Sequence, residues 1–140
     1  MASELFVDAG AWIALSDARD RHHRAATAYH QRLLHDRRML VTTNLVVAEA
    51  YVLIRRRGGH QAAVRFLRAL NRSNVVQKVY SDAQVEGEAE EILRRYDDQD
   101  FSYADAVSFT VMRARGIDHA FAFDRHFQSA GFSLVPDPAS

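Results

Sequence analysis

The chain has 140 residues, enough to bury one hydrophobic core of ordinary size but too few for two. Hydrophobic residues make up 48% of the sequence and charged residues 26%, which is the balance of a compact globular protein. Its 18 basic and 18 acidic residues cancel, so the net charge alone gives no argument for a nucleic-acid partner. No cysteine occurs, which excludes disulfides and thiolate metal sites and leaves oxygen and histidine ligands for any metal.

Membrane insertion and secretion are not indicated by the sequence. No apolar run approaches the roughly 18 to 20 residues that a membrane span needs, and the N-terminus MASELFVDAG lacks the basic and apolar regions of a signal peptide. We therefore expect a cytosolic protein without membrane contact. We expect one domain over residues 1–136 and a short tail at 137–140, with disorder confined to the closing PDPAS.

Short apolar runs alternate with helical segments along the chain. Strands are predicted at 5–7, 39–41, 75–80, 121–123 and 132–135. Helices are predicted at 11–18, from an N-cap at Asp20 to about 36, at 45–57, 60–71, from a cap at Ser81 or Asp82 to about 96, and from a cap at Ser102 to about 115. Short strands alternating with helices predict an α/β fold, in which a parallel sheet is sandwiched between helices.

Four acids are predicted to meet at one edge of this sheet. In open α/β sheets, ligands bind beyond the carboxyl ends of the strands. Asp8 and Asp124 each follow a predicted strand directly, and Asp105 lies in the first turn of its helix. Glu49 lies about one and a half turns into the helix after the second strand. Its neighbours in VVAEAYVLI are apolar, so its ionised carboxylate is expected to need a partner.

A metal ion would explain four neighbouring carboxylates. Carboxylates held close together repel one another, and a hard divalent cation such as Mg²⁺ stabilises their ionised forms. Bound Mg²⁺ can orient a phosphodiester and lower the pKa of the water that attacks phosphorus. The residues alone therefore indicate phosphodiester hydrolysis.

Each acid also has a purely structural explanation. Asp105 forms an S-x-x-D capping box with Ser102, and Asp124 next to Arg125 is compatible with a surface ion pair or a turn. Glu49 could pair with an arginine, and Asp8 could cap the helix that follows it.

Four segments, FVDAGAWIAL, TTNLVVAEAYVLI, FSYADAVSFTVMRARGI and AFAFDRHFQSAGF, resemble in order and spacing the motifs of PIN-domain ribonucleases. The similarity is closest to the VapC-type toxins of bacterial toxin–antitoxin pairs, and it covers almost the whole chain. It implies a parallel five-stranded sheet between helices. It also implies that Asp8, Glu49, Asp105 and Asp124 are an acidic quartet that binds one or two Mg²⁺ or Mn²⁺ ions and cleaves RNA with activated water. Asp8 and Asp105 would be the direct ligands, while Glu49 and Asp124 would complete the site.

The same resemblance implies an RNA substrate, a homodimer and a small cognate antitoxin. Thr43 and Asn44 match small polar residues that flank the pocket in such proteins, although helix capping explains them equally well. Arg125 and the run Arg55–Arg57 are candidates for a positive rim around the acids, although the run also suits the end of a helix.

Two other functions compete with the ribonuclease. The first is a non-catalytic or housekeeping PIN-like module that binds or processes RNA. The second is a small phosphatase with Asp8 as its nucleophile, which is disfavoured because Ala9 and Gly10, rather than a second aspartate, follow Asp8. Nucleotide-dependent enzymes are poor candidates because neither phosphate-binding glycine motif occurs.

Overall fold

The structure is a computed structural model, and it describes residues 4–137. Its sheet is formed by five strands: β1 (Leu5–Val7), β2 (Leu40–Thr43), β3 (Val76–Val79), β4 (His119–Phe121) and β5 (Ser133–Val135). The strand order is β3-β2-β1-β4-β5, and all neighbouring strands are parallel. The predicted α/β fold class is confirmed. Of the expected tail at 137–140, residues 138–140 lie outside the described range.

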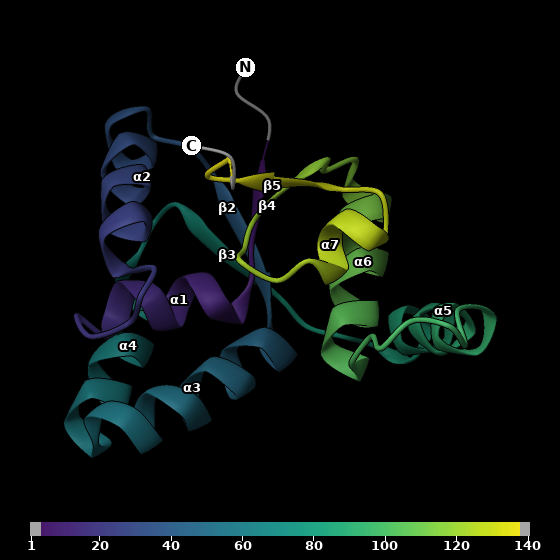
Figure 1. Ribbon diagram of the computed structural model, residues 1–140, viewed down its shortest axis with the longest axis horizontal. Helices are drawn as coiled ribbons and strands as arrows, with labels where there is room; N and C mark the ends of the chain where they lie inside the picture. Colours follow the sequence, from purple (N-terminus) through teal and green to yellow (C-terminus); the bar gives the residue numbers. More distant parts are fainter. Residues whose placement is uncertain (1–3, 138–140) are drawn as a thin grey trace.

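Helices cover both faces of the sheet. They are α1 (Ala9–Ser16), α2 (His23–His35), α3 (Asn44–Gly58), α4 (His60–Arg72), α5 (Ala83–Arg95), α6 (Tyr103–Arg115) and α7 (His126–Ser129). Figure 1 shows α1, α2 and α4 on one side of the strands and α5, α6 and α7 on the other, with α3 below the strands. No helix in residues 4–137 is long and apolar enough to cross a membrane.

The central elements are apolar on all sides because they are covered on all sides. Leu5, Phe6 and Val7 of β1 are fully buried, as expected for a central strand of a parallel sheet. Phe6 pairs with Val41 on one side and with Ala120 on the other. Residues 105–112 of α6 are likewise all buried, because α6 contacts both the sheet and α5. This double cover explains why the sequence of α6 has no polar face.

Several helix ends follow the predicted local chemistry. Thr43 caps α3 by accepting a hydrogen bond from the Val46 N–H (3.1 Å), and Asp82 caps α5 in the same way. Both hydrogen bonds of the Ser102–Asp105 capping box are present at 3.0 Å.

Several element bounds differ from the prediction by one to three residues, and three differences have a local cause. The fourth strand is 119–121 rather than 121–123, because the chain leaves the sheet after Phe121 and Phe123 instead stacks on His22. Asp20 does not cap α2: its carboxylate accepts a hydrogen bond from the His22 N–H, and the helix begins at His23. Helix α7 was not predicted, because four residues are too few to show a helical period.

Candidate metal centre

Asp8 and Asp105 are the buried members of the predicted quartet, each with only 7% of its surface exposed. Asp8 follows β1, and its N–H donates to the carbonyl of Phe121 in the neighbouring strand (3.0 Å). It occupies the N-cap position of α1, yet its side chain makes no capping hydrogen bond. The carboxylate of Asp8 therefore does not serve the capping role that was its structural alternative.

Electrostatics shows that the four acids act on one another. Burial, opposed by the N–H of Ala9 and reinforced by the charges of Asp105, Glu49 and Asp124, raises the pKa of Asp8 to about 7. Partial burial and then the charges of Asp105 and Asp124 raise the pKa of Glu49. The structure thus brings together all four predicted acids: Asp8 directly after β1, Asp124 in the segment after β4, Glu49 in the second turn of α3 and Asp105 in the first turn of α6.

The expectation that Glu49 lies among apolar neighbours in a helix core is wrong. The helical period turns Val46, Val47 and Ala50 inward, whereas residue 49 lies on the exposed side of α3. The apolar composition of VVAEAYVLI concealed this amphipathic arrangement. Glu49 reaches the site from the solvent side, and it lines a cavity together with Asp8 and Asp124.

That cavity has a volume of about 530 Å³, and part of its wall is formed by basic and aromatic side chains. These are Arg19, Arg21, His22, Arg57 and Phe123. The wall is held in place by an ion pair between Arg57 and Asp20 (2.9 Å) and by a hydrogen bond from Arg19 to the carbonyl of Arg57 (2.6 Å). His22 stacks on Phe123 with ring centroids 4.1 Å apart.

The predicted positive rim is therefore only partly at this cavity. Arg57 lines it, but Arg55 and Arg56 are not among its lining residues, and Arg125 lines a neighbouring cavity that also contains Asp124. The 19–22 segment, which supplies most of the basic wall, was not predicted, because its arginines and histidine do not follow a motif.

His126 is a further member of the acidic cluster that the sequence did not suggest. Its Nδ1 lies 2.8 Å from Oδ2 of Asp105 and 3.3 Å from Oδ2 of Asp124. One ligand atom from each of these three residues lies within 4.8 Å of the others. The sequence feature that could have indicated His126 is its position, two residues after Asp124 and directly before Phe127, a core residue that fixes the local backbone.

The two small polar residues proposed to flank the pocket have structural partners. Besides the cap made by Thr43, Oδ1 of Asn44 accepts a hydrogen bond from the N–H of Ser81 (2.9 Å), which ties α3 to the segment after β3. Thr42, which was not predicted, bonds to the residue that directly precedes Asp8. Its hydroxyl donates to the carbonyl of Val7 (2.9 Å) and accepts from Nε1 of Trp12 (3.3 Å).

Replacing Thr42 by Val, which has nearly the same shape, is expected to lower the free energy of unfolding by about 1 to 3 kcal/mol. The substitution removes both hydrogen bonds and leaves the Val7 carbonyl and the Trp12 N–H buried without that partner. Urea denaturation measures the change, with Thr27→Val in α2 as a control expected to stay within about 0.5 kcal/mol of wild type. Equal stability of the two variants would contradict the role given to Thr42.

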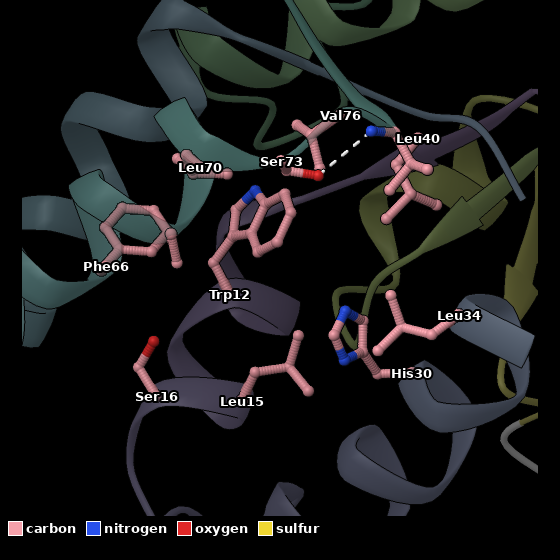
Figure 2. A pocket seen from close by; sticks show the side chains of 12 residues that line it. Trp12, Leu15, Ser16, His30, Leu34, Leu40, Phe66, Leu70, Ser73 and Val76 are labelled. Carbon is pink, nitrogen blue, oxygen red and sulfur yellow. Dashed lines mark hydrogen bonds between the residues drawn. The ribbon is translucent and has the colours of Figure 1, made fainter. Parts of the chain in front are cut away.

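A third cavity, of about 370 Å³, is lined mainly by apolar side chains and contains none of the four acids. Figure 2 shows Trp12 and His30 facing this space from α1 and α2, with Phe66 and Leu70 of α4 beside it. Burial lowers the pKa of His30, which favours its neutral form. None of the residues that line this cavity is acidic.

Comparison with known proteins agrees with this geometry. The profile of the PIN domain matches residues 5–133. The 23S rRNA-specific endonuclease VapC20 of Mycobacterium tuberculosis, found in two strains, is 42% identical over 132 residues, which cover 94% of this chain and 97% of the relative. The crystal structure of Mycobacterium tuberculosis VapC20, described as a sarcin-ricin loop cleaving toxin, matches with a TM-score of 0.81 and 40% identity. That match covers 91% of this chain and 95% of the other. The chain belongs to the PIN domain family.

Proposed function

We propose that this protein is an endoribonuclease that hydrolyses a phosphodiester bond of 23S rRNA, in or near the sarcin-ricin loop, and that it is the toxin of a toxin–antitoxin pair. The observation that carries the proposal is the convergence of Asp8, Glu49, Asp105 and Asp124 at one edge of the sheet. The identity to a 23S rRNA-specific endonuclease over almost the whole chain supports the substrate class.

The acids fit a hard divalent cation. In residues 4–137, no arginine or lysine forms an ion pair with any of the four acids, and only His126 lies against two of them. Burial first and mutual repulsion second raise the pKa of Asp8 and of Glu49, and no basic side chain of this part of the chain offsets either effect. Oxygen donors of this kind suit Mg²⁺ or Mn²⁺, and we propose either ion as the cofactor.

The four acids have two proposed roles, which differ with the burial of the side chain. Asp8 and Asp105 would hold the metal, because their burial excludes water from the carboxylates. Glu49 and Asp124, which are more open to solvent, would complete the ligand set or orient a water molecule toward phosphorus. A divalent cation supplies polarisation of the phosphoryl oxygen and a lowered pKa of its bound water. Arg19, Arg21 and Arg57, which line the same cavity, offer positive charge for the RNA backbone.

RNA cleavage by purified protein tests the proposal. Wild type is expected to cut 23S rRNA at one place in the presence of Mg²⁺ or Mn²⁺ and to stop in chelator. Asp105→Asn is expected to lower the cleavage rate by at least about 100-fold, since even residues that only support metal ligands contribute 10- to 100-fold. Asp100→Asn, a change of an exposed acid just before α6, is the matched control and should cut like wild type.

Two outcomes would overturn the enzymatic proposal. One is full cleavage by Asp105→Asn in the presence of metal, which would place the chemistry elsewhere. The other is RNA that binds but stays intact at saturating metal, which would favour a non-catalytic RNA-binding module.

We also propose a small protein antitoxin and a homodimeric state, as the similarity to VapC-type toxins implies. Co-purification with the product of an adjacent reading frame, followed by light scattering of the free protein, tests both. A toxin is expected to lose cleavage activity when its antitoxin is bound and to regain it when the antitoxin is removed.

A further inference from the structure

His126 contacts two of the four acids, Asp105 and Asp124. Oδ2 of Asp105 accepts a hydrogen bond from Nδ1 of His126 at 2.8 Å, and the same nitrogen lies 3.3 Å from Oδ2 of Asp124. The backbone N–H of His126 also donates to Oδ1 of Asp124 at 2.9 Å. One residue thus fixes the separation of two carboxylates from different elements, Asp105 in α6 and Asp124 in the segment after β4.

The imidazole ring is held in this place by packing. Phe101 meets the ring edge-on with centroids 5.6 Å apart, and Phe101 is held in turn by Phe109 of the buried α6 (5.0 Å). The next residue, Phe127, is fully buried and packs on Phe6 and Phe109. The ring therefore has support on its aromatic side and along its backbone, which is what orienting a neighbouring ligand requires.

The hydrogen bonds to Asp105 are all on one of its oxygens. Oδ2 accepts from Nδ1 of His126 and from the N–H of Ser102 (3.0 Å), whereas no residue within 4–137 donates to Oδ1. A carboxylate only accepts hydrogen bonds, so Nδ1 must carry the hydrogen. Both the neutral tautomer with its hydrogen on Nδ1 and the imidazolium ion meet this requirement.

We propose that His126 is a positioning residue of the metal centre, which binds Oδ2 of Asp105, steadies Asp124 beside it and so leaves Oδ1 of Asp105 for the metal. This inference rests on the proposed function, because it assigns a role within the same site. The Nδ1–H group of His126 also offsets part of the repulsion between the two carboxylates, and His126 does so without being a metal ligand itself. Residues that orient metal ligands in this way typically contribute 10- to 100-fold in metal affinity or activity.

Two substitutions separate this role from simple packing. His126→Ala removes the donor, whereas His126→Asn places an amide N–H near the position of Nδ1 and restores it. Metal affinity is read from the dependence of the unfolding temperature on Mn²⁺ concentration, and each variant is first compared in chelator to confirm that it folds. Gln128→Ala, an exposed position in the same α7, is the control and should behave like wild type.

We expect His126→Ala to weaken Mn²⁺ binding by about 10- to 100-fold and His126→Asn to stay within about threefold of wild type. The rate of RNA cleavage at saturating metal should follow the same order. Wild-type affinity in His126→Ala would overturn the proposal, and so would an equal loss in both variants, which would make the imidazole nitrogen itself a ligand. Asp105→Asn, measured in parallel, distinguishes the two proposals: if it loses metal and cleavage while His126→Ala keeps both, only the role of His126 fails.

Discussion

Replacing Asp8 by Asn is expected to make the metal-free protein more stable while it abolishes RNA cleavage. Asp8 is buried among Asp105, Glu49 and Asp124, and its pKa is raised to about 7 by burial and by these charges. In the unfolded chain the pKa of an aspartate is about 3.9. Ionised Asp8 therefore opposes folding at neutral pH in the absence of metal, and an uncharged side chain of the same shape relieves that opposition.

The sign of the pH dependence follows from this shift. Below about pH 4, Asp8 is protonated in both states and does not affect the difference between them. As pH rises from about 4 to about 7, the folded state holds the proton more tightly than the unfolded state, so the contribution of Asp8 to stability falls, and it stays low above about pH 7. A shift of about three pKa units corresponds to roughly 4 kcal/mol, which is the upper limit of the gain from Asp8→Asn at high pH.

Thermal unfolding of wild type and Asp8→Asn in chelator, from about pH 5 to about pH 8, measures this difference. In chelator, the unfolding temperature of the variant should rise above that of wild type by several degrees as pH increases. Saturating Mn²⁺ should reverse this order, because only wild type binds Mn²⁺ well. Cleavage by the variant should fall by at least about 100-fold. A variant that is less stable than wild type in chelator at the highest pH would show that Asp8 is not under repulsion.

The substitution Phe127→Ala is expected to destabilise the fold by about 3 to 5 kcal/mol. Phe127 is fully buried and packs on Phe6 of the central strand (6.1 Å) and on Phe109 of α6 (5.2 Å). It thereby fastens the short α7 to the core. The loss is a large fraction of the roughly 5 to 15 kcal/mol that stabilises a typical domain, so urea denaturation at low temperature is the suitable measurement.

Phe127→Leu is the conservative comparison and should lose less free energy of unfolding than Phe127→Ala, because it leaves a smaller cavity. A loss below about 1 kcal/mol for Phe127→Ala would mean that α7 packs on the core by other contacts. Metal affinity should fall with Phe127→Ala even where the protein remains folded, because His126 loses its buried neighbour.

Most of the fold could be predicted because local chemistry and the global arrangement agree in it. The Ser102–Asp105 capping box and the cap of Thr43 stand in the sequence as spacings and occur in the structure as hydrogen bonds. The bounds of the fourth strand could not be predicted in the same way. Apolar residues continue past the end of this strand as far as Phe123. The place where the chain leaves the sheet depends on the stacking of Phe123 on His22, a contact between residues distant in sequence.

The proximity of Asp8 and Asp124 could be predicted because the carboxyl ends of parallel strands converge by topology alone, whereas Glu49 and Asp105 reach the same edge from helices. His126 and Thr42 could not, because their roles depend on distances across elements rather than on spacing along the chain. Thr42 bonds to the carbonyl of Val7 in a neighbouring strand, and His126 bonds to an acid 21 residues earlier. Composition also misled the interpretation of Glu49, because Val46, Val47 and Ala50 point to the core while Glu49 faces the cavity.

The central claim, that acids distant in sequence form one metal site, is tested most directly by thermal unfolding of wild type, Asp105→Asn and Asp100→Asn in chelator and then in Mn²⁺ or Mg²⁺. Metal at about 100 times its Kd should stabilise wild type by roughly 2.7 kcal/mol. The account predicts the same gain for Asp100→Asn, whose exposed carboxylate lies outside the cluster, and little or none for Asp105→Asn. Equal stabilisation of all three proteins would contradict it, since the metal would then bind without Asp105.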